Sequence, residues 1–176
     1  MIIQGAVTTL KFKGVEISAL DYHHYLPLFV SGLREEEEPY RFLAEEGSLR
    51  LISEPGCEGK VLATVPQLII PLKDALGTHV EKVIIRTMRV LTELAGLSPS
   101  IGAALVPFYR QLLPPLNPYM GKDVNLGDGI DYGQRFGHFG EKITACLETL
   151  EVNGGPDALV NLKYCLPLYE SALMFQ

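Results

Sequence analysis

Residues 106–113, VPFYRQLL, carry the pattern that decides the fold: an aliphatic residue before a proline, then an aromatic residue or leucine two positions after it and a leucine six positions after it. The pattern recurs around Pro27, Pro66, Pro107 and Pro167, at intervals of 39, 41 and 60 residues. A proline inside a helix removes one backbone hydrogen bond and costs on the order of 3 kcal/mol. Four copies in phase therefore indicate an internal repeat, in which one helix type bends at the same place.

Straighter amphipathic helices are predicted between the proline-containing segments. From Thr78 to Ala95, apolar residues return every three or four positions and charged residues occupy the opposite face. The segment near 137–152 repeats this spacing and ends at Asn153-Gly154-Gly155, which predicts a helix stop. We expect kinked helices near residues 22–33, 60–76, 99–113 and 157–174, and straighter helices near 39–52 (interrupted at Gly47), 78–95 and 137–152.

These helix pairs predict the fold class. Pairs that return about every 40 residues are typical of HEAT and armadillo proteins, in which each pair buries its apolar face against the next. The predicted fold is all-α, a short HEAT/armadillo-like α-solenoid with proline-kinked helices. Residues 1–20 are expected to form an N-terminal extended arm, because apolar and polar residues alternate between Leu10 and Ser18. Residues 21–176 form the helical repeat domain, and a long inserted loop at about 117–136 explains the last interval.

Helix starts have recognisable sequence signals. Asp21 and Ser98 are predicted N-caps, and Ser98 is followed by a proline suited to the first helical position. Glu38-Pro39 is expected to start a helix in the same way, and Pro156-Asp157 to open the last one. The acidic run that ends at Glu38 is interpreted as a solvated helix-start cluster.

Composition excludes several functional classes. The 176 residues are 47% apolar and 20% charged, which predicts one folded unit. The formal charge of −6 argues against nucleic-acid binding, and no stretch resembles a membrane span or a signal peptide. Three cysteines far apart fit an intracellular, reducing environment. Cys146 and Cys165 are expected to be buried thiols, whereas Cys57 is expected in a turn without a role.

Two segments contain candidate interaction residues. The first is Asp21, His23 and His24; adjacent histidines on a helix point about 100° apart, and the HExxH zinc pattern is absent. Their expected structural roles are a helix cap, a packed histidine and a solvent-exposed histidine. A metal-assisted hydrolase using these residues and the loop aspartates is the weakest alternative.

The second segment is the inserted loop, because ordered loops longer than about 12–15 residues are often functional. Counted from Asp123 as an EF-hand, its sixth residue is Asp128 in place of glycine and its twelfth is Gln134 in place of glutamate. A calcium site is therefore not predicted, and no metal or cofactor is expected. The candidate interaction residues in the loop are Asn125, Asp128, Asp131 and Tyr132.

Motifs of catalysis are missing from the sequence. It contains no GxSxG elbow, phosphate-binding GxxxxGK[ST] loop, GxGxxG fingerprint or CxxC pair. We therefore expect a protein that is not an enzyme. A soluble adaptor that binds a small protein partner along the solenoid is one such function.

Five stretches in the same order, covering about Val15 to Leu173, closely resemble the parkin co-regulated gene protein (PACRG) family. They are LDYHHYLPLF (20–29), PQLIIPLKDAL (66–76), ALVPFYRQLLPPLN (104–117), GDGIDY (127–132) and PLYESAL (167–173).

The resemblance implies a HEAT-like, non-enzymatic structural protein in the cytoskeleton of cilia and flagella. It implies tubulin binding at the inner junction of the axonemal microtubule doublet, where family members help to join the B-tubule to the A-tubule. The implied partners are a β-rich flagellar-associated inner-junction protein and, in sperm-forming cells, a small meiosis-expressed adaptor. Family members carry a longer N-terminal arm, whereas about twenty residues precede the LDYHHY segment here. The resemblance therefore leaves the arm's part of the tubulin contact open.

Overall fold

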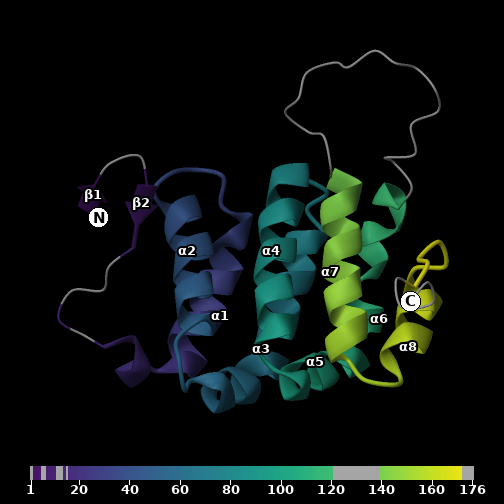
Figure 1. Cartoon of the computed structure of the whole chain (residues 1–176). Coiled ribbons are helices and arrows are strands. Elements are labelled where there is room, and N and C mark those ends of the chain that lie inside the picture. Colours follow the sequence, from purple (N-terminus) through teal and green to yellow (C-terminus); the bar gives the residue numbers. More distant parts are fainter. Residues whose placement is uncertain (1, 5–6, 11–13, 15, 121–138, 172–176) are drawn as a thin grey trace.

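A computed structural model of the chain describes residues 2–4, 7–10, 14, 16–120 and 139–171. Residues 16–120 and 139–171 form a helical body (Figure 1). Its α-helices are α1 (Tyr22–Ser31), α2 (Tyr40–Ile52), α3 (Glu58–Leu76), α4 (Glu81–Leu97), α5 (Pro99–Leu105), α6 (Tyr109–Leu112), α7 (Phe139–Asn153) and α8 (Ala158–Cys165). Shorter 3-10 helices are η1 (Ile17–Ala19), η2 (Gly32–Arg34), η3 (Val106–Phe108) and η4 (Pro114–Tyr119). The all-helical prediction is confirmed for this body.

The helices form two layers (Figure 1). In one layer α4 lies between α2 and α7 and packs against both. In the other, α1 packs on α3, α3 on α5 and α6, and α6 on α8. The layers are joined by contacts of α1 with α2, α3 with α4, and α7 with α5 and α8. The core therefore lies between layers in which each helix touches its near neighbours.

The repeated proline pattern places its apolar residues in this core. The four residues before the prolines, Leu26, Val65, Val106 and Leu166, are all buried. The positions two and six residues after the prolines are also buried in most copies, including Leu68, Tyr109, Tyr169, Leu33, Leu72 and Leu113. The repeat therefore describes a recurring way of packing against the core.

The prolines act differently in different copies. Pro27 lies inside α1 and Pro66 inside α3, and both helices continue through them. At Pro107 the expected helix over 99–113 is divided into α5 and α6 by the η3 turn. The predicted kinked helix over 157–174 is wrong, because α8 ends at Cys165 and the chain makes a turn at Pro167. Proline favours an extended residue before it, and Leu166 has φ −130° and ψ 83°.

The predicted interruption of the second helix at Gly47 is also wrong. Gly47 lies inside the continuous helix α2 and is buried. A Cβ atom at this position would lie 2.7 Å from the Phe29 ring, so glycine allows α1 to approach α2. Close packing, and not a helix break, explains this glycine.

Three of the predicted helix-boundary signals are confirmed. The Asp21 side chain accepts a hydrogen bond of 3.0 Å from the backbone N–H of His23. Ser98 accepts one of 3.4 Å from the N–H of Ile101 at the start of α5. The end of α7 is followed by Gly155 with φ +78°, a conformation that glycine adopts without strain.

Two segments outside the main helices differ from the expected pattern. At the N-terminus, β1 (Ile2–Gln4) pairs antiparallel with β2 (Val7–Thr9), with Ile2 opposite Thr9. The described end of the alternating segment, Ile17–Ala19, is the η1 turn and not a strand. Residues 117–119, expected in the inserted loop, belong to η4.

Candidate functional site

The Asp21–Tyr25 segment begins α1, and its residues are exposed except for the buried Tyr22. The Asp21 carboxylate caps the helix, and His23 Nδ1 lies 3.1 Å from Gln67 Nε2 of α3. His24 is exposed and meets the Tyr25 ring edge-on, with 5.0 Å between the ring centroids. The two histidines thus have different neighbours, and within the described ranges no group of three or more His, Cys, Asp or Glu side chains could hold a metal ion. An interaction role for Asp21, His23 and His24 stays a prediction.

The other predicted residues belong to the insertion. Asn125, Asp128, Asp131 and Tyr132 lie outside the residues that the structure describes. Their role in interactions stays a prediction.

Buried tyrosines join the two layers at helix ends. The Tyr22 hydroxyl donates a hydrogen bond of 3.0 Å to the Leu51 carbonyl near the end of α2. The Tyr109 hydroxyl donates one of the same length to the Leu150 carbonyl near the end of α7. Burial raises the pKa of both tyrosines well above the ordinary value. Both hydroxyls therefore remain donors at neutral pH. Tyr22 satisfies a carbonyl in the last turn of α2, where the helix leaves carbonyls without partners. Tyr109 adds a second hydrogen bond to the Leu150 carbonyl, which also accepts one from the Gly154 N–H.

A buried carboxylate fixes the C-terminal segment onto α7. Glu151 accepts a hydrogen bond of 2.7 Å from the Tyr169 hydroxyl and a second from the Ser171 hydroxyl. Burial, reinforced by the hydrogen bond to Glu151, raises the pKa of Tyr169. These contacts satisfy a charge that is 5% exposed, and they identify Glu151 as a structural anchor.

The three cysteines are buried and free. This confirms the prediction for Cys146 and Cys165. Burial raises the pKa of the Cys146 thiol to about 12, so the thiol is protonated and unreactive at neutral pH. Cys57 ends the predicted turn, where its N–H donates to the Glu54 carbonyl over 3.3 Å. It is 2% exposed and belongs to the core directly before α3.

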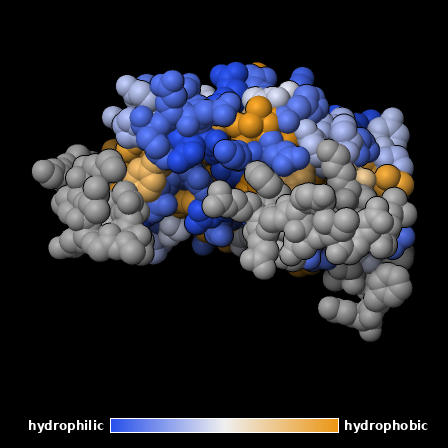
Figure 2. All heavy atoms as spheres, turned by 90° about the horizontal axis from the view of Figure 1, so that it is seen from above, coloured by the Kyte–Doolittle hydropathy of each residue, from blue (hydrophilic) through white to orange (hydrophobic). Residues whose placement is uncertain are grey.

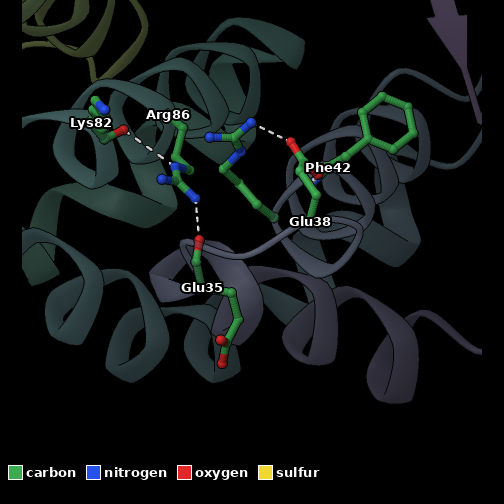
Figure 3. Close-up of polar contacts among 6 residues, drawn as sticks. Glu35, Glu38, Phe42, Lys82 and Arg86 are labelled. Atoms are coloured by element: carbon green, nitrogen blue, oxygen red, sulfur yellow. Dashed lines mark hydrogen bonds and ion pairs between the residues drawn. The ribbon is translucent and has the colours of Figure 1, made fainter.

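Residues Glu35–Glu38, hereafter the acidic turn, connect η2 to α2 and are held by Arg86 of α4 (Figure 3). Arg86 of α4 is 5% exposed and donates hydrogen bonds to the carbonyls of Glu35 and Lys82. Glu38 accepts a hydrogen bond of 3.2 Å from the Phe42 N–H and pairs with Arg41. Burial, followed by repulsion from Arg41, lowers the pKa of Arg86. The turn is thus tied to the core through its backbone, while its residues are exposed.

An open groove lies beside the acidic turn, between the end of α1 and the start of α2. We call it the α1–α2 groove. Its volume is about 400 Å³. Leu28 and Tyr40 on its two sides are 54% and 63% exposed. The groove is lined by Leu28, Phe29, Gly32, Glu35, Tyr40, Leu43 and Ala44.

Two other surface features of the described residues lack this combination of shape and charge. A smaller groove of about 260 Å³ lies between α4 and α7, where Arg89, Glu93 and Lys142 mix both charge signs. On α8, Val160 and Tyr164 are about 70% exposed, and Arg110 lies 4.5 Å from the centroid of the Tyr164 ring. Seen from above, the described surface is mainly hydrophilic with separate apolar patches (Figure 2).

Sequence reasoning missed the α1–α2 groove and Arg86. The charged spacing of α4 placed Arg86 on the solvent face, whereas the structure buries it beneath the acidic turn. The available signal was an apolar helix end followed by four consecutive glutamates, which was interpreted only as a helix start.

Comparison with known proteins identifies the family. The family described as "Parkin co-regulated protein" matches residues 1–171. A mouse relative, "Parkin coregulated gene protein homolog", is 47% identical over 161 residues. The alignment covers 91% of this chain and 66% of the mouse protein, so the chain spans just under two thirds of that relative. The chain belongs to the parkin co-regulated protein family.

Proposed function

We propose that this chain is a non-enzymatic structural protein of the ciliary and flagellar axoneme. In this proposal it binds tubulin at the inner junction of the microtubule doublet and helps to join the B-tubule to the A-tubule. The observation that carries the proposal is the family match over residues 1–171, together with the functional expectations of the family resemblance. The three cysteines are buried, and the Tyr22 and Tyr109 hydroxyls bind backbone carbonyls near helix ends. These side chains stabilise the fold, as expected of a scaffold.

The architecture supports a scaffold as well. We interpret the two layers as a short HEAT/armadillo-like solenoid, because helices close in sequence pack side by side in both layers. Such an array offers separate surfaces along its length. The proposed partners are tubulin, the β-rich flagellar-associated inner-junction protein and, in sperm-forming cells, the small meiosis-expressed adaptor.

Electrostatics sets an expectation for tubulin binding. The chain has a formal charge of −6, and the microtubule lattice is itself acidic. At physiological salt the screening length is about 8 Å, so local contacts decide affinity and net repulsion contributes little. Binding to a single microtubule should therefore be modest. Binding at a junction that offers two tubulin walls and a partner protein should be much tighter, because joined sites raise the effective concentration.

Two measurements test this proposal. The purified chain is co-sedimented with plain microtubules, with and without the β-rich junction partner, and the bound fraction is measured. The tagged chain is also expressed in ciliated cells, and its retention in isolated doublets is followed as salt is raised. We expect weak binding to plain microtubules, a large increase with the partner, and retention in salt-washed doublets.

A soluble adaptor is the alternative function, and the exposed α1–α2 groove favours it. Tight binding to plain microtubules, combined with loss from doublets at low salt regardless of the partner, would refute the junction scaffold. The protein would then be assigned as an adaptor.

A further inference from the structure

We propose that the α1–α2 groove binds a short amphipathic segment of a partner protein, with apolar side chains in the groove and lysine or arginine residues against the acidic turn. This inference names the chemistry of a binding surface and does not depend on an axonemal location. It rests on the shape of the groove, on the charges beside it and on how the acidic turn is held.

The groove supplies the apolar half of the recognition. Leu28 and Tyr40 remain more than half exposed at 54% and 63%, and the partly buried Phe29 and Leu43 lie between the two helices. Burying apolar surface yields about 25 cal/mol per Å². A volume of about 400 Å³ accommodates a few large side chains of a partner.

The acidic turn supplies the charged half. Nearby arginines are already neutralised, since Arg34 pairs with Asp74, Arg41 with Glu38, and Arg89 with Glu45. Within the described part of the chain, Glu35, Glu36 and Glu37 form no ion pair. Arg86 offsets part of their charge, but it binds the Glu35 backbone, and in Figure 3 the Glu35 carboxylate points away from it. A basic partner is therefore complementary to the acidic turn, which forms the charged rim of the groove.

The rim is positioned before any partner binds. Arg86 holds the carbonyl of Glu35, and the Phe42 N–H binds the Glu38 carboxylate at the other end of the turn. A preorganised surface loses less conformational entropy on binding than a loose one. The backbone that carries the three unpaired carboxylates is therefore set next to the groove.

Charge also argues against a second copy of this chain as the occupant. In a twofold dimer the same patch occupies both sides of the interface. Two acidic turns would then face each other, and juxtaposed like charges oppose association. A basic partner avoids this repulsion.

The test uses three fluorescent 14-residue helical peptides with the full chain. The first has a leucine stripe flanked by lysines, the second replaces the lysines with glutamates, and the third replaces the leucines with serines. Binding is measured by fluorescence anisotropy at 50 and 500 mM salt. We expect the lysine peptide to bind at least tenfold tighter than either other peptide, and high salt to weaken it by more than threefold.

Variants locate the site. Leu28→Ser and Tyr40→Ser should each lower affinity for the lysine peptide about fivefold to tenfold, because each removes apolar contact at a position already exposed in the free protein. Ile70→Ser is the matched control, since Ile70 is 69% exposed on α3 outside the groove, and it should leave affinity unchanged.

The charged rim has its own pair of variants. Glu35→Gln, Glu36→Gln and Glu37→Gln together should lower affinity about tenfold and remove most of the salt dependence. The control combines Glu58→Gln, Asp157→Asn and Glu170→Gln, which neutralise three exposed carboxylates elsewhere. It should change neither the affinity for the lysine peptide nor the salt dependence of binding.

Several outcomes would overturn the proposal. It fails if the lysine peptide does not bind at 1 mM, or if the lysine and glutamate peptides bind with equal affinity. It also fails if the groove variants and their controls lose the same amount of affinity for the lysine peptide. Self-association that Leu28→Ser abolishes would assign the groove to a second copy instead. Peptide binding without microtubule binding would leave this inference standing while removing the axonemal proposal, so the two fail separately.

Discussion

Replacing Tyr169 by phenylalanine tests how the C-terminal segment is held. The substitution keeps the buried ring and removes only the hydroxyl that donates to Glu151 over 2.7 Å. A hydrogen bond to a charged group contributes about 1.5–3 kcal/mol, and after its loss the buried carboxylate retains the Ser171 hydroxyl. For a chain of this size each kcal/mol shifts the melting temperature by about 2–4 °C. We therefore expect Tyr169→Phe to lower it by about 3–12 °C.

The measurement is thermal and urea unfolding followed by circular dichroism. The matched control is Tyr164→Phe, because Tyr164 is 69% exposed and lies only five residues earlier. This control should stay within about 0.5 kcal/mol of the unmodified chain, as surface substitutions usually do. Equal effects of the two substitutions, or an unchanged melting temperature for Tyr169→Phe, would refute the anchoring role of Glu151.

Four further predictions use unfolding measurements. The pKa of Cys146 is raised by burial to about 12, above its unfolded value. Its stabilising contribution is therefore complete below about pH 9 and falls by about 1.4 kcal/mol per pH unit above it. The free energy of unfolding in urea, measured between pH 9 and 10.5, should therefore fall less steeply with pH in Cys146→Ala than in the unmodified chain. An unchanged slope would contradict this. Gly47→Ala should lower the free energy of unfolding by more than about 1 kcal/mol, because its Cβ would clash with the Phe29 ring. Gly59→Ala is the control: its Cβ would meet open space, so the substitution should raise the free energy of unfolding by up to about 1 kcal/mol. Changes of the same sign in both variants would refute the packing argument. Replacing residues 121–137 with a short Gly/Ser linker should preserve the helical spectrum and cooperative melting, because loop length changes closure entropy little, and loss of the fold would assign this segment to the core. Chelator treatment should leave the melting temperature unchanged, whereas a drop of many degrees would reveal a structural ion.

Sequence periodicity predicted the helical body because burial in this fold follows local spacing. The residue before each repeated proline is buried in all four copies, so a pattern visible in the sequence reports a packing position. Asp21 and Ser98 were predictable as caps for a similar reason, since their side chains act within three residues of their own position.

Features that depend on distant residues were not predictable in this way. The burial of Arg86 depends on the Glu35 carbonyl, 51 positions away in the sequence. Gly47 resembled a helix break because its reason, the Phe29 ring, lies on another helix. Pro167 has the neighbouring residues of the repeat, but it lies outside a helix, because α8 ends at Cys165. Packing does not set the roles of Asp21, His23 and His24 either, because these three side chains are exposed.

The neighbour-to-neighbour packing of the two layers also sets how the molecule opens in time. α3 contacts α1, α4, α5 and α6, whereas α8 is held mainly by α6 and α7. Backbone amides of α3 should therefore exchange with deuterium only through global unfolding, while those of α8 exchange through a smaller local opening. Local opening should therefore be most frequent at the end of the array where Glu151 binds Tyr169 and Ser171. The Glu151 carboxylate then sets the rate at which this end opens.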